Sequence, residues 1–138
     1  MKNEGRKRVL FLCTHNSARS QMAEGLLRSM AGERFEVASA GTERTRVHPL
    51  AVEAMREIGI DIGGHTSKTL DAFRGERFDY VITVCDRANE SCPLFPGDTE
   101  RIHWSFDDPS AASGSDQERL AVFRTVRDAI RQRLRSFR

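Results

Sequence analysis

The sequence predicts a single α/β domain over residues 1–138, in which a four-stranded parallel sheet is flanked by helices in three layers. Short β-prone runs alternate with helical patterns, and the runs are apolar enough for burial on both faces, as parallel strands require. No internal repeat, low-complexity segment or linker divides the chain. A chain of 138 residues can bury one core without metal or disulfide cross-links.

Strands and helices are expected to alternate from the first strand to the last helix. The expected strands are residues 8–12, 35–40, 78–84 and 101–105. The expected helices are residues 18–31, 49–58, 67–73, a brief segment after Cys85, and 116–136. Apolar side chains of the last helix recur at spacings of three and four, and they are Leu120, Phe123, Val126, Ile130, Leu134 and Phe137. The arginines of this helix are expected to form a solvated opposite face.

Charge and hydropathy exclude several classes of partner. The 22 basic and 20 acidic residues leave a formal net charge of +2, without the clustered Lys and Arg of a nucleic-acid interface. The longest apolar stretch, residues 9–13, is too short to span a membrane, and the polar N-terminus does not resemble a signal peptide. We therefore expect a cytoplasmic monomer. Its three cysteines stay reduced there, as reactive or buried thiols.

The segment from Cys13 to Ser20 is the strongest candidate for an active-site loop. It contains a Cys, five intervening residues, an Arg and a Ser, but a Cys–Arg pair at this spacing has a chance expectation of roughly 0.4 in this chain. The context is more specific than the spacing. A strand is expected to end at Cys13 and a helix to begin near Ala18, with small polar residues in the turn, which lets successive amides point at an anion.

A tetrahedral oxyanion such as phosphate or arsenate fits this loop. It would meet backbone amides, the positive end of the helix and the planar guanidinium of Arg19. The expected oxyanion-binding residues are Thr14, His15, Asn16, Ser17, Ala18 and Arg19. The same field should lower the pKa of Cys13 and favour its thiolate, and Ser20 can add a hydroxyl bond to the sulfur. The alternatives are a buried structural Cys13 and a Walker loop, but the glycines and lysine of a Walker loop are missing.

Residues 9–24, with Cys13, Asn16, Arg19 and Ser20, resemble the low-molecular-weight tyrosine phosphatase superfamily, and more narrowly its thioredoxin-coupled arsenate reductases. The resemblance continues through Ser39-Ala40-Gly41, His65-Thr66-Ser67, Val84-Cys85, Cys92-Pro93 and His103-Trp104-Ser105-Phe106-Asp107-Asp108-Pro109. It implies an oxidoreductase of arsenic resistance that reduces arsenate to arsenite without a cofactor. It also implies thioredoxin as the reducing partner, with phosphate or sulfate as competing oxyanions.

Asp108-Pro109 resembles the loop of the family that supplies a general acid. Asp108 would protonate the oxygen that leaves the central atom, and a desolvated site beside a bound oxyanion favours its protonated form. Asp107 is expected to be only a neighbour, and a plain turn is the alternative interpretation of Asp-Pro. Phosphatases of the superfamily usually carry aromatic residues after this proline, whereas here Ser110-Ala111-Ala112 follow.

Cys85 and Cys92 favour a reductase, because arsenate reduction needs two electrons from a thiol pair whereas a phosphatase needs one nucleophile. In the mechanism that we expect, Cys13 attacks arsenic, Cys85 attacks Cys13 to release arsenite, and Cys92 attacks Cys85. If residues 86–91 are helical, the α-carbons of Cys85 and Cys92 lie about 10 Å apart, so a disulfide requires unwinding. The segment is short, polar and stopped by Pro93, which permits that change. Two incidental buried thiols are the alternative.

No confident metal site is predicted, because the four histidines have no ligand spacing with the cysteines; they are His15, His48, His65 and His103. The resemblance implies potassium near Asn16, Glu24 and Ser39, with an acid where this chain has Lys68. That difference disfavours the ion, and the ammonium of Lys68 would pair with Glu24 in its place unless Lys68 is simply solvated.

Two other functions remain open at this stage. A low-molecular-weight tyrosine phosphatase would use Cys13, Arg19 and Asp108, and the loop leads us to expect weak phosphatase activity in any case. A phosphocysteine carrier module would hold a phosphoryl group on Cys13 without hydrolysing it, but Asp108 disfavours that function.

Overall fold

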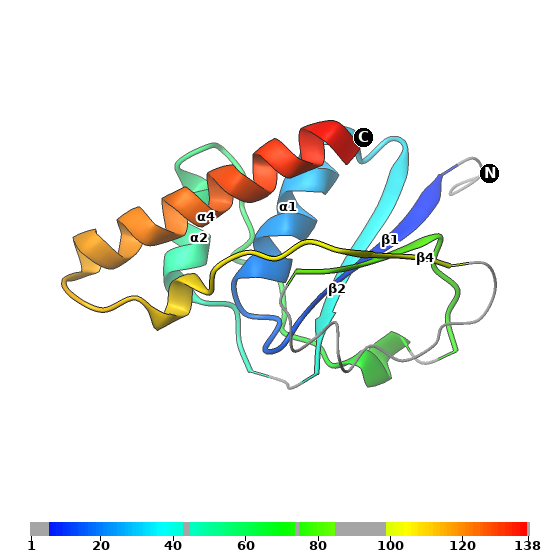
Figure 1. The fold of residues 1–138 in the computed structure, drawn as a ribbon, viewed down its shortest axis with the longest axis horizontal. Helices are drawn as coiled ribbons and strands as arrows, with labels where there is room; N and C mark the ends of the chain where they lie inside the picture. The colour runs from blue at the N-terminus through cyan, green and yellow to red at the C-terminus, as the bar shows by residue number, and fades with distance from the viewer. Residues whose placement is uncertain (1–5, 43–44, 74, 85–98, 138) are drawn as a thin grey trace.

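The structure is a computed structural model that describes residues 6–42, 45–73, 75–84 and 99–137 (Figure 1). Four strands form one sheet in the order β2-β1-β3-β4, and each neighbouring pair is parallel. The strands are β1 (Lys7–Cys13), β2 (Phe35–Gly41), β3 (Tyr80–Thr83) and β4 (Glu100–His103). The predicted α/β class and the four predicted strands are confirmed. Because the strands are parallel, their carboxyl ends meet at one edge of the sheet, where ligands bind in this architecture.

The centre of the sheet is buried on both faces. From Val9 to Leu12, side chains that alternate between the two faces are all at most 1% exposed. This explains why an apolar run without alternation predicted β1 correctly, since strands covered on both sides need no polar face. Cys13 is the last residue of β1 and is 3% exposed.

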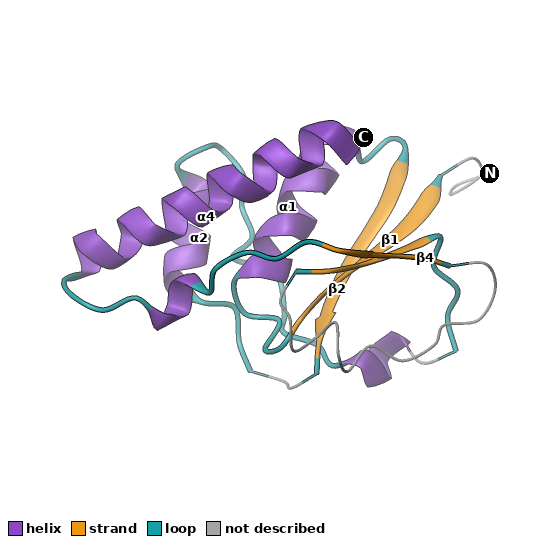
Figure 2. Ribbon diagram, in the orientation of Figure 1, coloured by secondary structure: helices purple, strands orange, loops and turns teal. Residues whose placement is uncertain are grey.

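Three α-helices lie on one side of the strands, and a short 3₁₀ helix lies on the other (Figure 2). They are α1 (Arg19–Ala31), α2 (Pro49–Arg56), α4 (Asp116–Phe137) and the 3₁₀ helix η1 (Leu70–Phe73). The helix predicted over residues 67–73 is therefore wrong in type and length. Residues 67–69 are extended instead, with Thr69 bridging to Gly41 beside β2, because pairing there satisfies backbone groups that a helix would satisfy internally. The helix predicted after Cys85 lies outside the described residues.

The predicted stripe of α4 packs against the rest of the core. Leu120, Phe123, Val126, Ile130 and Leu134 are all buried, and the Phe137 ring stacks against an aromatic cluster that includes Phe35, Tyr80 and Trp104. The expectation that the arginines of this helix are solvated is wrong at Arg127, which is 8% exposed. Its guanidinium donates to the Ala54 carbonyl at the end of α2 (2.8 Å) and pairs with Glu57. Arg127 therefore joins α4 to α2.

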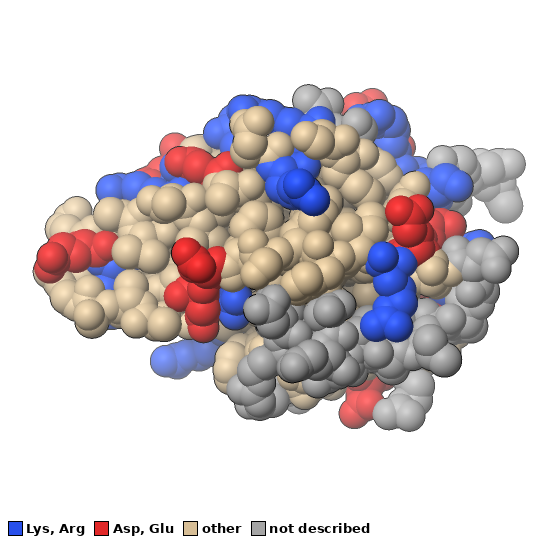
Figure 3. All heavy atoms as spheres, viewed as in Figure 1, with Lys and Arg blue, Asp and Glu red and all other residues tan. Residues whose placement is uncertain are grey.

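Basic and acidic side chains are interspersed on the face drawn in Figure 3, without a continuous stripe of one sign among the described residues. This agrees with the near-balance of charge in the sequence. None of the described helices combines the length and the apolar composition needed to cross a bilayer.

Candidate active site

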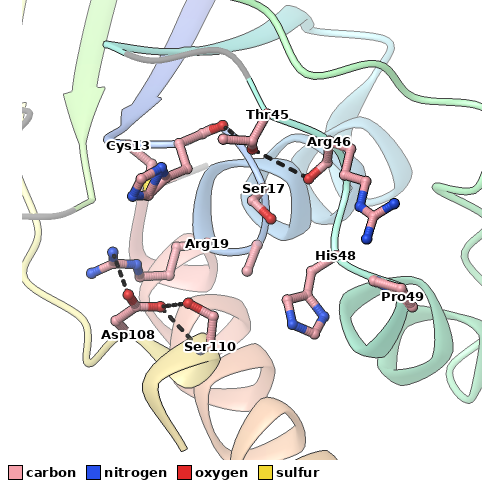
Figure 4. A pocket seen from close by; sticks show the side chains of 11 residues that line it. Cys13, Ser17, Arg19, Thr45, Arg46, His48, Pro49, Asp108 and Ser110 are labelled. Atoms are coloured by element: carbon pink, nitrogen blue, oxygen red, sulfur yellow. Dashed lines mark hydrogen bonds and ion pairs between the residues drawn. The ribbon is translucent and has the colours of Figure 1, made fainter.

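A pocket of about 280 Å³ opens where β1 meets α1 (Figure 4). It is lined by Cys13, His15, Ser17, Ala18, Arg19, Thr45, Arg46, His48, Pro49, Asp108 and Ser110. Residues from three separate parts of the chain, 13–19, 45–49 and 108–110, therefore converge on this pocket. At about 30 Å³ per water molecule, the volume equals roughly nine waters, which is ample for a five-atom oxyanion such as arsenate.

The backbone carbonyls between Cys13 and Arg19 are held from outside the loop. Four consecutive carbonyl oxygens accept hydrogen bonds from residues elsewhere in the fold. The bonds run from Thr42 Oγ1 to Thr14, from Thr45 Oγ1 and Ser67 Oγ to His15, from Gln21 Nε2 to Asn16, and from His48 N to Ser17, at 2.9–3.2 Å. Since the C=O and the N–H of a peptide unit point in opposite directions, this arrangement directs the following amides toward the inside of the loop.

The N-terminus of α1 is left open toward the same pocket. Ala18 occupies the N-cap position without a side-chain cap, and the first turn contains no acidic residue. The first amides of a helix need partners, and an oxyanion supplies them. The helix end also carries a partial positive charge that stabilises anions, including a thiolate at Cys13.

Arg19 is fixed at the pocket by a backbone anchor. Its Nη1 donates to the Phe106 carbonyl (3.0 Å), and its Nη2 lies 3.7 Å from Asp108 Oδ2. Its Nε is buried without a hydrogen-bond partner among the described residues. An unpaired buried donor is costly, so a guanidinium held in this way is prepared for an anionic ligand.

Asn16 holds the loop in an unusual backbone conformation. Its φ of 50° lies in the left-handed region, which is uncommon outside glycine. The side chain is buried and donates to Ser20 Oγ and Ser39 Oγ (both 2.9 Å), while its Oδ1 accepts from Gln21 Nε2 (2.9 Å) and Lys68 N (2.8 Å). These bonds offset the backbone strain. The bond predicted from Ser20 to the Cys13 sulfur stays a prediction.

Gly41 allows the end of β2 to pack directly against the loop. A Cβ atom at Gly41 would lie 2.7 Å from both Asn16 N and Thr14 O, and 2.9 Å from His15 C. All three are backbone atoms, so no side-chain rotation could relieve the contact. Gly41, with Gln21, Thr45 and the other outer donors, was not assigned a role from sequence. Ala40-Gly41 and Thr66-Ser67 matched the family resemblance, but nothing in their pattern predicted these contacts. Hydrogen bonds between distant segments leave no periodic signal in the sequence.

Asp108 faces Arg19 across the pocket and precedes the 3₁₀ helix η2 (Pro109–Ala111). Burial alone would raise the pKa of Asp108, but hydrogen bonds from Ser110 and the charges of Arg19 and His15 outweigh burial and place it below its usual value. The expected protonated Asp108 is therefore not the state that the ligand-free geometry favours. Asp107 does not line the pocket.

His48 forms the outer wall of the pocket. Its ring Nδ1 accepts from Leu50 N (3.1 Å) as the N-cap of α2, and the ring packs against Phe123 of α4 at 4.7 Å between centroids. Burial, together with the nearby Arg119 and Arg46, lowers the pKa of His48, although Asp108 opposes this. His48 therefore joins the loop to two helices as a neutral side chain near pH 7.

Of the two alternatives for Lys68, pairing with Glu24 is wrong. Arg28, one helical turn along α1, binds Glu24 Oε2 at 2.5 Å, and Ser39 Oγ donates to Glu24 Oε1 at 2.5 Å. Lys68 Nζ donates instead to the Thr66 carbonyl (2.8 Å). The four-residue helical spacing places Arg28 directly beside Glu24. Nowhere in the described ranges do three or more His, Cys, Asp or Glu side chains gather as metal ligands, and potassium binding stays untested.

The structure thus brings Cys13, Arg19 and Asp108 to one pocket, together with His15, Ser17 and Ala18. Thr14 and Asn16 are buried and do not line the pocket, so their side chains do not face a bound oxyanion. Cys85 and Cys92 lie outside the described residues.

A strand-terminal cysteine, an open helix N-terminus and a buried arginine around one loop form a site suited to a tetrahedral oxyanion beside a thiol, as in enzymes of the cysteine-loop class. The family model described as low molecular weight phosphotyrosine protein phosphatase matches residues 8–138. The chain belongs to this family.

The relatives of the chain include proteins named arsenate reductase, although the family model is named for a phosphatase. An arsenate reductase of Halalkalibacterium halodurans is 50% identical over 96% of this chain and 95% of its own. A solved structure described as an arsenate reductase in the phosphate binding state is 37% identical, covers 95% of each chain and has a TM-score of 0.76. The thioredoxin-dependent arsenate reductase of Corynebacterium glutamicum is 32% identical, with a TM-score of 0.70 over 97% of this chain and 63% of its own.

Proposed function

We propose that the chain is an arsenate reductase that uses Cys13 as its nucleophile. The observation that carries the proposal is the loop between Cys13 and Arg19, whose carbonyls are bound from outside the loop and which borders a pocket sized for a small oxyanion. The 50% identity to an arsenate reductase over almost the whole chain supports arsenate as the substrate. We place the reaction in the cytoplasm, where thiols stay reduced, and in a monomer.

Arsenate binds with its oxygens on the loop amides and on the guanidinium of Arg19. The thiolate of Cys13 attacks arsenic, and a sulfur–arsenic bond forms as one arsenic–oxygen bond breaks. Asp108 delivers a proton to the departing hydroxyl group of arsenate, which leaves as water. Its position beside Arg19, with Oδ2 3.7 Å from Nη2, puts the carboxyl at the edge of the oxyanion site.

Two further thiols complete the reduction in our proposal. The Cys85 thiolate attacks the Cys13 sulfur, the sulfur–arsenic electron pair goes to arsenic, and arsenite leaves with As(III). Cys92 then attacks Cys85 and releases Cys13, and thioredoxin reduces the Cys85–Cys92 disulfide. The support is the number and order of the cysteines in the sequence and the thioredoxin dependence of the Corynebacterium glutamicum relative.

A coupled assay tests the proposal. Arsenate-dependent oxidation of NADPH is measured with thioredoxin and thioredoxin reductase, and it should vanish in Cys13→Ser. Cys92→Ser should retain one turnover of arsenite release but lose steady-state turnover. Unchanged steady-state reduction in Cys92→Ser would refute the relay, whereas absence of any arsenate-dependent oxidation in the unaltered protein would refute the function.

A tyrosine phosphatase is the second candidate, because the family shares the same cysteine loop. Against it, the described residues of the outer pocket wall are Thr45, Arg46, His48, Pro49 and Ser110, and none of them is a Phe, Tyr or Trp that would hold a phosphotyrosine ring. We expect weak hydrolysis of p-nitrophenyl phosphate through the shared loop. Strong hydrolysis of this ester without arsenate reduction would favour the phosphatase.

A further inference from the structure

Ser110 makes two hydrogen bonds to the same oxygen of Asp108. The backbone N–H of Ser110 donates to Asp108 Oδ1 at 3.0 Å, and its hydroxyl donates to the same atom at 2.6 Å (Figure 4). The first bond is the N-cap of η2, which any residue except proline could make at position 110. The second bond depends on the serine side chain.

The two oxygens of Asp108 therefore have different surroundings. Oδ1 has two lone pairs and both are engaged by Ser110, so a proton is disfavoured there. Oδ2 faces Arg19 Nη2 at 3.7 Å, which is an ion-pair distance but too long for a strong hydrogen bond. Oδ2 is thus the oxygen that can take up a proton and that lies toward the bound oxyanion.

We infer that Ser110 is a positioning residue that holds Asp108 so that Oδ2 carries the proton to the departing oxygen. The inference rests on the proposed function, in which Asp108 is the general acid. When the bond between arsenic and the departing hydroxyl group breaks, its electron pair stays on the hydroxyl oxygen, which takes the proton from Oδ2 and leaves as water. The negative charge that remains on Asp108 is then stabilised at Oδ1 by the Ser110 hydroxyl.

Three charged or titratable groups from other parts of the fold also face Asp108. They are Arg19 from α1, His15 from the cysteine loop, and the neutral His48 at the N-cap of α2. Among the groups that lower its pKa, the Ser110 hydroxyl has a larger effect than the charge of either Arg19 or His15. Loss of the hydroxyl should therefore raise the pKa of Asp108 while these three groups stay in place.

The test compares Ser110→Ala with Ser110→Thr, which keeps a hydroxyl at the same atom. Ser105→Ala is the matched control, since Ser105 lies on the same loop and makes no hydrogen bond to Asp108. The rate of the first chemical step is measured by single-turnover arsenate reduction across pH, and the Asp108 carboxyl is titrated by carbon-13 NMR. Inorganic phosphate serves as the binding probe.

Ser110→Ala should slow the chemical step by about tenfold, because a misplaced acid loses part of a contribution worth roughly 10²- to 10⁴-fold. The alkaline limb of the rate profile and the NMR titration should both move up by about half to one pH unit. Ser110→Thr should restore both values, and phosphate affinity should stay within about twofold in every variant, because the loop and Arg19 bind the anion.

Wild-type rates and an unmoved titration in Ser110→Ala would overturn the inference. Asp108→Asn separates this failure from a failure of the proposed acid. If Asp108→Asn slows the chemical step and Ser110→Ala does not, only the positioning role is wrong. If Asp108→Asn leaves the step unchanged, the general acid is misassigned and Ser110 has nothing to position. Thermal unfolding of Ser110→Ala should match the wild type, because Ser110 is exposed.

Discussion

Gly41→Ala tests whether the cysteine loop depends on the close approach of β2. The added methyl group would sit 2.7 Å from Asn16 N and Thr14 O. The loop would have to retreat by about 0.3 Å to reach the shortest distances that real Cβ atoms show, and by about 0.7 Å to reach ordinary contact. Since the φ of Gly41 is not positive, the backbone itself accepts alanine, and the whole effect comes from this contact.

The expected consequence falls mainly on the active site. Overpacking of this kind costs about 1–3 kcal/mol of folding free energy. A displacement that approaches 1 Å near the reacting atoms costs roughly 10²-fold in rate. We therefore expect Gly41→Ala to lose most of its affinity for phosphate and about 100-fold in arsenate reduction, while the folded state survives.

Calorimetric titration with phosphate, the coupled arsenate assay and urea unfolding measure the three effects. Gly64→Ala is the matched control, because a Cβ at Gly64 meets nothing within 4 Å and its φ is ordinary. Wild-type phosphate affinity and activity in Gly41→Ala would refute the role of this contact. A loss of stability with full activity per folded molecule would refute it as well.

Three other substitutions test separate parts of the structure. Arg127→Met should lower the free energy of unfolding in urea by about 1–3 kcal/mol, because it removes the donor to the buried Ala54 carbonyl; an effect no larger than that of Arg131→Met would contradict this. Burial lowers the pKa of His48, so the unfolded state protonates first and stability should fall as pH drops below about 6.5. His48→Asn keeps an N-cap and should flatten that fall in urea titrations at pH 7.5 and 5.5; an equally steep fall would argue against it. Arg46→Gln should raise the KM for arsenate at low salt with kcat unchanged, and a KM insensitive to both the substitution and salt would exclude electrostatic capture by Arg46.

The strands and long helices could be predicted because burial leaves a local pattern. Residues 9–13 of β1 form an uninterrupted apolar run because both faces of the sheet are covered, and α4 shows its stripe at helical spacing. Arg127 is an exception to the expected solvation of the α4 arginines, because it lies four residues after Phe123 and therefore beside the apolar stripe. An arginine can be buried there because the last carbonyls of α2 and Glu57 accept its donors. The sequence of α4 alone contains no signal for the hydrogen-bond acceptors that the end of α2 supplies.

The active site also has parts that the sequence predicted and parts that it did not. Cys13 and Arg19 were predictable because strand, turn and helix signals are local to the loop. The outward hydrogen bonds were not, since Thr42, Thr45 and Ser67 come from segments 28 to 52 residues away. Small polar residues between elements normally indicate only turns and loops. Their role as donors to the loop depends on which edges of the sheet lie together, and that is a property of the fold.

The protonation of Asp108 shows how the ligand-free site and the reaction fit together. Without an oxyanion, Ser110 and Arg19 favour the carboxylate, and Arg19 is held by the Phe106 carbonyl whether or not Asp108 is charged. A bound dianion occupies the guanidinium and places like charge next to Oδ2, and both changes raise the pKa of Asp108. Proton uptake by Asp108 is therefore expected to accompany substrate binding rather than precede it. The acid then becomes available only when there is an oxygen to protonate, and the ion pair with Arg19 prevails when there is none.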